Sequence, residues 1–186
     1  MTDDPKALPY AQHKSALWNR SGARVHAVVD GLVVPGMAAR LADADVAGWD
    51  CLQRGALSAE ASERAAYIFE LRPDSSFTDW LLTVAPTVHP RWGVLMVSNQ
   101  PMLAMRHHCR DLCSVATADG ERRQWRWYDP DLLDLLLPTM SASQLDELFG
   151  AGQSMVLLAR DAWTWYAMEH GVLASSVRPL APAAAQ

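Results

Sequence analysis

The chain has 186 residues, of which half are apolar and a fifth are charged, so its composition excludes a wholly disordered protein. The 16 Lys and Arg against 21 Asp and Glu give a formal net charge of −5. This balance argues against general nucleic-acid binding, which needs clustered basic side chains, and no apolar run reaches the ~18 residues of a membrane-spanning helix.

The thiols and the first residues bear on the cellular compartment. The start of the chain lacks the positive charge, apolar stretch and small-residue cleavage site of a signal peptide. The chain has three cysteines, Cys51, Cys109 and Cys113. A small, odd number of cysteines is typical of reduced thiols. The sequence therefore predicts a cytoplasmic protein.

The first half of the chain alternates strands with short helices. Residues 1–21 show no clear period and are expected to form an N-terminal arm, either mobile or covering a partner site. Apolar runs predict strands at 24–30, 49–52, 65–71 and 92–98. Helices are expected within 36–46 and at 77–85, the second opened by a capping-box pair, Ser76 and Asp79.

The second half has the clearest helix signals. Helices are expected at 102–112, 131–137 and 143–150. Asp129 is a good N-cap and Pro130 suits the first helical position, so the pair starts the second of these helices. Before it, a hairpin is predicted with its turn at Asp119–Gly120 and its second strand reaching Tyr128. Two further strands are expected at 155–160 and 162–169, and the residues after Gly171 are expected to be mostly disordered.

These elements predict an α/β fold, with a mixed β-sheet and packed helices. A single domain with a small C-terminal lobe of helices and strands is expected. Along the chain, we expect an N-terminal arm at 1–21, a core domain at 22–150, C-terminal strands at 151–174 and a disordered tail at 175–186.

Common catalytic signatures are missing from the sequence. The chain has no glycine-rich phosphate loop, no nucleophile elbow and no His-Glu-x-x-His pair. Asp30 is either a general base at the edge of the sheet or a turn residue before Gly31, and the turn is favoured. No cofactor is expected.

One cluster has the residue types of a zinc site: His107, His108, Cys109 and Cys113. Two cysteines four residues apart share one face of a helix, but a fourth ligand would have to come from elsewhere. The alternative is that the thiols pack against the core, where free cysteines are commonly buried. The sequence favours packing, so no metal is expected.

Tryptophan accounts for eight of the 15 aromatic residues. Trp, Tyr and Arg are enriched in the hot spots of protein interfaces, and they are dense between 122 and 128. On a strand, Trp125, Trp127 and Asp129 share one face, whereas Arg126 and Tyr128 share the other. The candidate partner-binding residues are Trp92, Arg110, Trp125, Arg126, Trp127 and Tyr128, with Trp163 and Trp165 as a second patch.

Each of these candidates has a structural alternative. Any of the aromatic side chains could belong to the core instead, and for Trp92 and Trp127 the core is the favoured interpretation. Arg110 and Arg126 could pair with Asp30 or Asp129 and brace the ends of strands. The sequence alone leaves both interpretations of the arginines open.

A set of different short motifs lies in a fixed order along the chain. The central motif is Arg126-Trp127-Tyr128-Asp129-Pro130, followed by an apolar helix and by Gln144-Leu145-x-x-Leu148-Phe149-Gly150. The others are Val28-Val29-Asp30-Gly31, Trp80-Leu81, Trp92-Gly93-Val94-Leu95, and His108-x-Arg110-x-Leu112 with Asp119-Gly120. From about 25 to 150 the sequence resembles the adaptor, or effector-chaperone, proteins of the bacterial type VI secretion system. Cys109 stands where that family usually has Leu, and Trp127 where Phe is frequent.

The resemblance implies a protein that is not an enzyme. It would bind a toxic effector in the bacterial cytoplasm and help to load it onto the valine-glycine repeat spike protein, with no nucleic-acid partner. Asp30, Gly31, Asp129 and Pro130 would be structural motif residues, and the net charge of −5 suggests steering toward a basic partner segment. The alternatives are a small enzyme with an Asp30 or His107/His108 base, and a regulatory scaffold unrelated to secretion.

Overall fold

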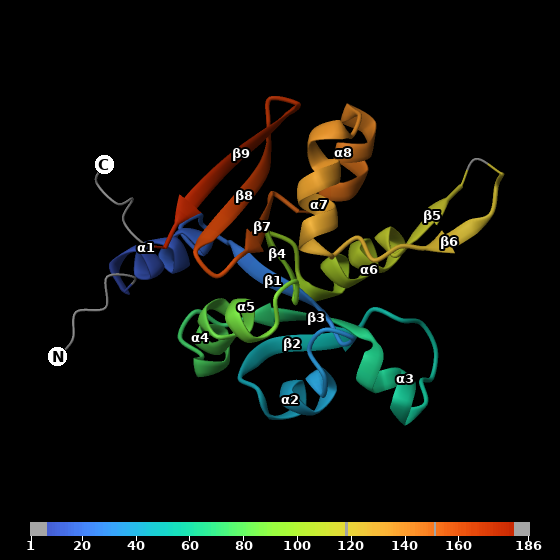
Figure 1. Ribbon diagram of the computed structural model, residues 1–186, viewed down its shortest axis with the longest axis horizontal. Coiled ribbons are helices and arrows are strands. Elements are labelled where there is room, and N and C mark those ends of the chain that lie inside the picture. Colours follow the sequence, from blue (N-terminus) through green and yellow to red (C-terminus); the bar gives the residue numbers. More distant parts are fainter. Residues whose placement is uncertain (1–6, 118, 151, 181–186) are drawn as a thin grey trace.

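A single antiparallel sheet organises the chain (Figure 1), which we describe from a computed structural model over residues 7–117, 119–150 and 152–180. The strand order across the sheet is β2-β3-β1-β4-β7-β8-β9. Its strands are β1 (Arg24–Asp30), β2 (Val46–Cys51), β3 (Ala66–Leu71), β4 (Gly93–Ser98), β7 (Ser154–Leu158), β8 (Ala162–Glu169) and β9 (Val172–Pro179). Strand β1 therefore lies inside the sheet, where β3 and β4 pair with its two edges.

Helices cover both faces of this sheet. One face packs against α1 (Ala7–Leu17), α2 (Met37–Asp43), α4 (Ser76–Thr83) and α5 (Ala85–Val88). The other packs against α6 (Met102–Leu112), α7 (Pro130–Leu136) and α8 (Ala142–Phe149). A short 3-10 turn (Leu137–Thr139) follows α7, and α3 (Ala59–Arg64) precedes β3. The molecule thus has three layers, helices on either side of one sheet (Figure 1).

Side-chain alternation along the strands divides the core in two. On β1, Val25, Ala27 and Val29 belong to the first core and Val28 belongs to the second. All four side chains are fully buried, because a strand covered on both faces has no solvent side. The sheet consequently supports two independent layers of helices.

A second, two-stranded sheet projects from the body of the molecule. It consists of β5 (Ser114–Ala116) and β6 (Arg122–Gln124), which continue from the C-terminal end of α6 and return toward α7 (Figure 1). Neither strand has a buried residue. The two strands of this hairpin therefore lie outside the buried core.

The predicted α/β class is confirmed, with corrections of detail. Every strand pair in the described part of the chain is antiparallel, whereas a mixed sheet was expected from the interleaved helices. The C-terminal strands join the main sheet rather than forming a separate lobe, because β7 pairs with β4. The helix and strand order alone did not reveal this pairing, because α2 and the α4–α5 pair connect strands that are not neighbours: β3 lies between β1 and β2, and β1 lies between β3 and β4.

Both ends of the described chain are more ordered than the sequence indicated. Residues 7–17 of the predicted arm form α1, whose Leu17 is fully buried, and residues 1–6 lie outside the described residues. The predicted disorder after Gly171 is wrong for 172–179, which form β9 and pair with β8 along its full length. Residues 181–186 lie outside the described residues.

Local signals explain the remaining differences. Ser75, not Ser76, caps α4 by accepting a hydrogen bond from the Phe77 amide at 3.2 Å. The second hairpin strand ends at Gln124 rather than at Tyr128, so the strand-face assignment of Trp125 to Asp129 is wrong.

None of the helices in the described part of the chain is long and apolar enough to cross a membrane.

Candidate functional site

Asp30 closes β1 and anchors the turn that follows it. Its carboxylate accepts a hydrogen bond from the Leu32 amide at 2.9 Å and forms an ion pair with Arg126. Gly31 passes so close to the chain before β3 that a Cβ there would lie 2.2 Å from the Ala65 carbonyl oxygen. The Asp30–Gly31 motif therefore has a structural role, and it fixes the position of Arg126.

Asp129 caps α7, as the sequence predicts. Its carboxylate accepts hydrogen bonds from the amides of Asp131 at 3.1 Å and Leu132 at 3.5 Å, with Pro130 at the first helical position. Arg91 pairs with Asp129 and also with Asp131. Burial would raise the pKa of the Asp129 carboxyl, but the Arg91 hydrogen bond and charge, with the backbone amides, hold that pKa below its usual value.

Four of the eight candidate contact residues are buried instead of exposed: Trp92, Trp127, Tyr128 and Trp163. Trp127 donates a hydrogen bond from its indole nitrogen to the Cys109 carbonyl at 3.1 Å. Tyr128 packs edge-on against Trp127, with ring centroids 6.0 Å apart. A partner cannot reach the three tryptophan rings without unpacking the core, so their role as contacts is corrected, and the core interpretation of Trp92 and Trp127 is confirmed. Tyr128 is 8% exposed and still lines a groove described below.

The second aromatic patch is reduced to Trp165. Trp163 is fully buried in the first core, whereas the ring of Trp165 is partly exposed, with the Arg178 guanidinium 4.2 Å from its centroid. Trp165 lines a shallow hollow of about 290 Å³ between α1 and the last strands. This arrangement offers one stacked aromatic side chain rather than the predicted pair.

The other candidates meet in a groove beside the hairpin, here called the basic groove, of about 820 Å³. Five arginines line it: Arg54, Arg64, Arg110, Arg122 and Arg126. Apolar and aromatic side chains also line it: Leu32, Leu52, Trp125 and Tyr128. Sequence reasoning missed Arg54 and Arg64, because they come from the loop after β2 and from α3, far in sequence from the hairpin.

A second groove lies on the other side of the hairpin, here called the apolar groove, of about 700 Å³. Its lining includes Leu112, Val115, Leu136, Met140 and Leu148, from α6, β5 and the α7–α8 region. Trp125, Ser114 and Arg122 line both grooves. The hairpin is therefore a wall shared by one basic and one apolar groove.

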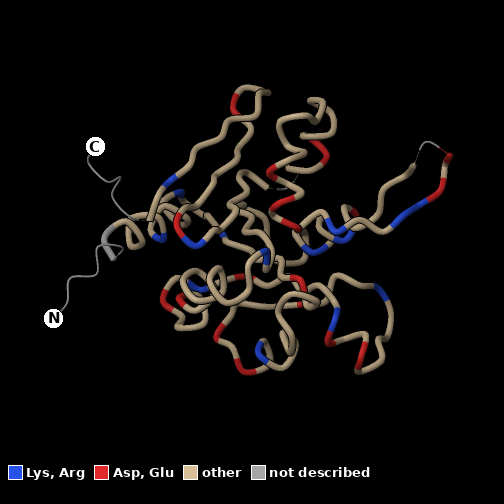
Figure 2. Tube along the Cα trace, in the orientation of Figure 1, with Lys and Arg blue, Asp and Glu red and all other residues tan. Residues whose placement is uncertain are grey.

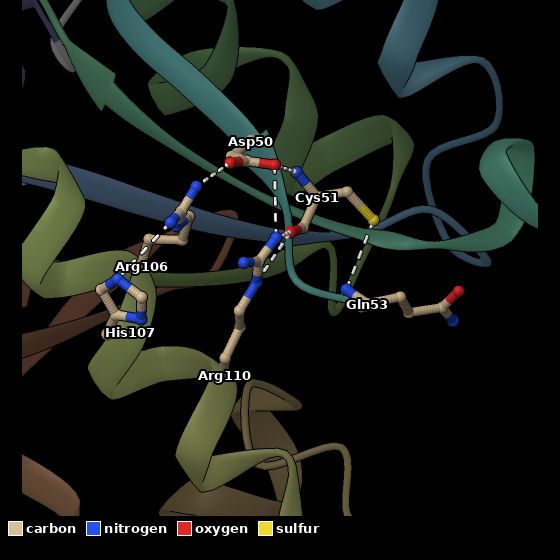
Figure 3. Close-up of polar contacts among 6 residues, drawn as sticks. All are labelled: Asp50, Cys51, Gln53, Arg106, His107 and Arg110. Carbon is tan, nitrogen blue, oxygen red and sulfur yellow. Dashed lines mark hydrogen bonds and ion pairs between the residues drawn. The ribbon is translucent and has the colours of Figure 1, made fainter. Parts of the chain in front are cut away.

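Two arginines of α6 hold the opposite wall of the basic groove in place (Figure 3). Arg106 and Arg110, four residues apart, both pair with Asp50 near the end of β2. Arg110 also donates to the Cys51 carbonyl oxygen at 2.6 and 3.2 Å. Since Leu52 and Arg54 follow directly, these contacts fix the loop that carries them. The predicted Arg110 pairing with Asp30 or Asp129 is wrong, whereas the Arg126–Asp30 pair is present.

The residues weighed as zinc ligands make separate structural contacts. The Cys109 thiol is buried 3.7 Å from the Met96 sulfur, and the Cys113 thiol donates to the Cys109 carbonyl at 3.2 Å. His108 Nε2 lies 3.0 Å from the Leu148 carbonyl. Burial raises the pKa of Cys113 to about 11, so its thiol stays protonated at neutral pH. Within the described ranges, no group of three or more His, Cys, Asp or Glu side chains could hold a metal ion.

Comparison with known proteins gives one match. A family model described as a domain of unknown function (DUF4123) matches residues 25–147. This family is known as a domain associated with the effectors of the type VI secretion system. No curated protein and no solved structure matches the sequence. Every residue that lines the basic groove lies inside the matched range.

Proposed function

The chain belongs to the DUF4123 family, and we propose that it is an adaptor that binds a type VI secretion effector and promotes its loading onto the valine-glycine repeat spike protein. In this proposal the chain acts in the bacterial cytoplasm and works by binding alone. The family match supplies the link to effectors, and the sequence resemblance to adaptor proteins supplies the step of loading.

The observation that carries this proposal is the hairpin wall between two grooves of different chemistry. An adaptor has to hold a cargo and a delivery protein, which calls for separate contact surfaces. Trp125 is partly exposed and lines both grooves, and an aromatic side chain at the centre of a contact surface is a typical source of binding energy.

Three residues considered for catalysis or for a metal site support a binding role: Asp30, His108 and Cys113. Asp30 is 2% exposed and already holds the Leu32 amide and Arg126. The Cys113 thiol is engaged with a backbone carbonyl and protonated at neutral pH. His108 is held near the Leu148 carbonyl, and burial lowers its pKa. Each of these groups therefore has a structural partner in place of a substrate.

The test is co-purification from the native bacterium with a tagged chain. Wild-type protein is expected to recover a toxin and a spike protein. Trp125→Ala is expected to recover less of at least one, whereas Trp49→Ala, which removes a 42% exposed ring on β2 away from both grooves, should recover both. Recovery of neither protein by a folded wild-type chain, under conditions where secretion is active, would contradict the adaptor role.

A further inference from the structure

The lining of the basic groove is rich in positive charge, although the whole chain is acidic. The protein carries a formal net charge of −5, yet five arginines line this groove against a single acidic side chain, Asp111. Figure 2 shows basic residues on β6 and at the nearby end of α6. Four of these arginines pair with carboxylates, on Asp30, Asp50, Glu60 and Asp111, whereas Arg122 bonds to a neutral hydroxyl and supplies the excess positive charge. A positive excess in a concave site attracts anions, because the surrounding protein concentrates the field.

Two of the five guanidinium groups are held in fixed positions. Arg126 pairs with the buried Asp30, and Arg110 is held by Asp50 and the Cys51 carbonyl. Groups that are already ordered lose little conformational entropy when a ligand binds. These two arginines therefore place positive charge at fixed positions in the groove.

The other three arginines remain accessible to a ligand. The side chains of Arg54 and Arg64 are 71% and 65% exposed, and each meets only an exposed carboxylate, on Asp111 and Glu60 respectively. Arg122 is exposed and donates from two nitrogens to the neutral Ser114 hydroxyl, at 3.0 and 2.8 Å. A carboxylate from a partner could replace these weak contacts with bidentate pairs.

Apolar side chains in the same groove add a second requirement. Leu32 is 47% exposed, and Leu52 and Trp125 line the groove near it. The bases of a single-stranded nucleic acid could stack on Trp125, but Leu32 and Leu52 are aliphatic and offer no stacking face. A peptide that carries both carboxylates and apolar side chains matches both kinds of lining, so the groove favours a protein segment over a nucleic acid.

We propose that the basic groove binds a short acidic segment of the effector, with its carboxylates on Arg54, Arg64 and Arg122 and an apolar side chain against Leu32 and Trp125. The identity of the partner as the effector rests on the proposed adaptor function. The charge of this site is opposite to the one expected from the acidic chain, which suggested a basic partner segment.

Fluorescence anisotropy with the full chain and a labelled peptide tests the proposal. The probe is a 12-residue peptide that alternates Glu with Leu and Phe, compared with the same peptide carrying Gln for Glu. We expect the acidic peptide to bind at least tenfold more tightly, and its affinity to fall as salt is raised from 50 to 300 mM.

Charge-reversing variants locate the binding. Arg64→Glu/Arg122→Glu is expected to weaken binding of the acidic peptide at least tenfold. The matched control is Arg20→Glu/Arg160→Glu, which makes the same charge change at two exposed arginines outside the groove and should weaken it less than threefold. Circular dichroism and thermal melting of both variants should match the wild type, because all four side chains lie on the surface.

Three results of the binding assays would overturn the proposal: equal binding of the acidic and neutral peptides, equal loss in groove and control variants, or tighter binding of a 12-nucleotide single-stranded RNA that the groove variant abolishes. These outcomes are separable from the adaptor role. Effector recovery that is unaffected by Arg64→Glu/Arg122→Glu would reject the groove and keep the adaptor. Peptide binding to a chain that recovers no effector would reject the adaptor.

Discussion

Trp125 and Trp127 lie two residues apart in the segment from Arg122 to Pro130 and have opposite environments. Trp125 belongs to the hairpin wall between two grooves, whereas Trp127 and Tyr128 are buried in the core and Asp129 begins α7. The change occurs where β6 ends, because the last hairpin bond joins the Trp125 amide to the Cys113 carbonyl at 2.9 Å. Residue type alone therefore does not separate an interface from a core; the point where pairing stops does.

The largest expected effect compares the two tryptophans of this segment. Trp127→Ala should lower the free energy of unfolding by about 3–5 kcal/mol, because it leaves a large cavity and removes the indole hydrogen bond to Cys109. Trp125→Ala should lower it by less than about 1 kcal/mol, because that ring is partly exposed. Urea denaturation of both variants checks the pair. Equal losses of unfolding free energy would contradict the assignment of Trp127 to the core and Trp125 to the surface.

The next largest effect is expected at the ion pair between Asp30 and Arg126. Asp30→Ala removes the acceptor of the Leu32 amide and the partner of Arg126, and should cost about 2 kcal/mol of stability. Arg126→Ala should cost at least as much, because it leaves the almost fully buried Asp30 carboxylate without its ion-pair partner, whereas Asp30→Ala leaves a guanidinium that is 48% exposed to water. Thermal melting ranks the two variants, and a smaller loss for Arg126→Ala would show that the buried carboxylate does not depend on Arg126.

The helix cap gives a smaller effect that depends on pH. Asp129→Ala should cost about 1 kcal/mol through loss of the N-cap, and Asp129→Asn should cost less because Asn also caps helices. The pKa of Asp129 is lowered in the folded state, so its charge stabilises the fold above the ordinary value of 3.8, and this stabilisation is lost as the pH falls below that value. Urea denaturation at pH 7 and pH 3 should therefore show a smaller difference between wild type and Asp129→Asn at pH 3. An equal difference at both pH values would contradict the ion pair with Arg91.

The smallest effect is expected at the exposed end of the segment. Arg122→Ala should change stability by less than about 0.5 kcal/mol, because its side chain contacts only the Ser114 hydroxyl and solvent. The same substitution should still weaken capture of the effector. A stability loss comparable to that of Trp127→Ala would place Arg122 in the core framework instead of the binding surface.

Short-range signals in the sequence predicted the elements that depend on neighbouring residues. The bounds of β1, β8 and α6 agree with the predicted ranges, and Asp129 and Ser141 cap the helices expected after them. These features follow from residues a few positions apart. Strand β9 was missed because its composition is poor in large apolar residues. Its signal was the turn before it, where His170 and Gly171 both have positive φ, at 55° and 80°, as a tight hairpin favours.

The candidate site was only partly predictable for a different reason. The sequence singled out Arg110, Trp125 and Arg126, which line the basic groove, but not Arg54 or Arg64. Those two come from the turn after β2 and from α3, for which no helix was predicted from the sequence. The place of Arg54 depends on the Asp50 contacts with α6, which join residues 56 and 60 positions apart, and that of Arg64 on the close approach of Ala65 to Gly31. No local pattern carries that information.

The most direct test of the adaptor role is secretion of the effector by the native bacterium. Deletion of the gene for this chain should remove the effector from the secreted fraction while the spike protein is still secreted. Complementation with Trp49→Ala should restore secretion, and complementation with an equally abundant Trp125→Ala chain should restore much less of it. Normal effector secretion in the deletion strain would contradict the account.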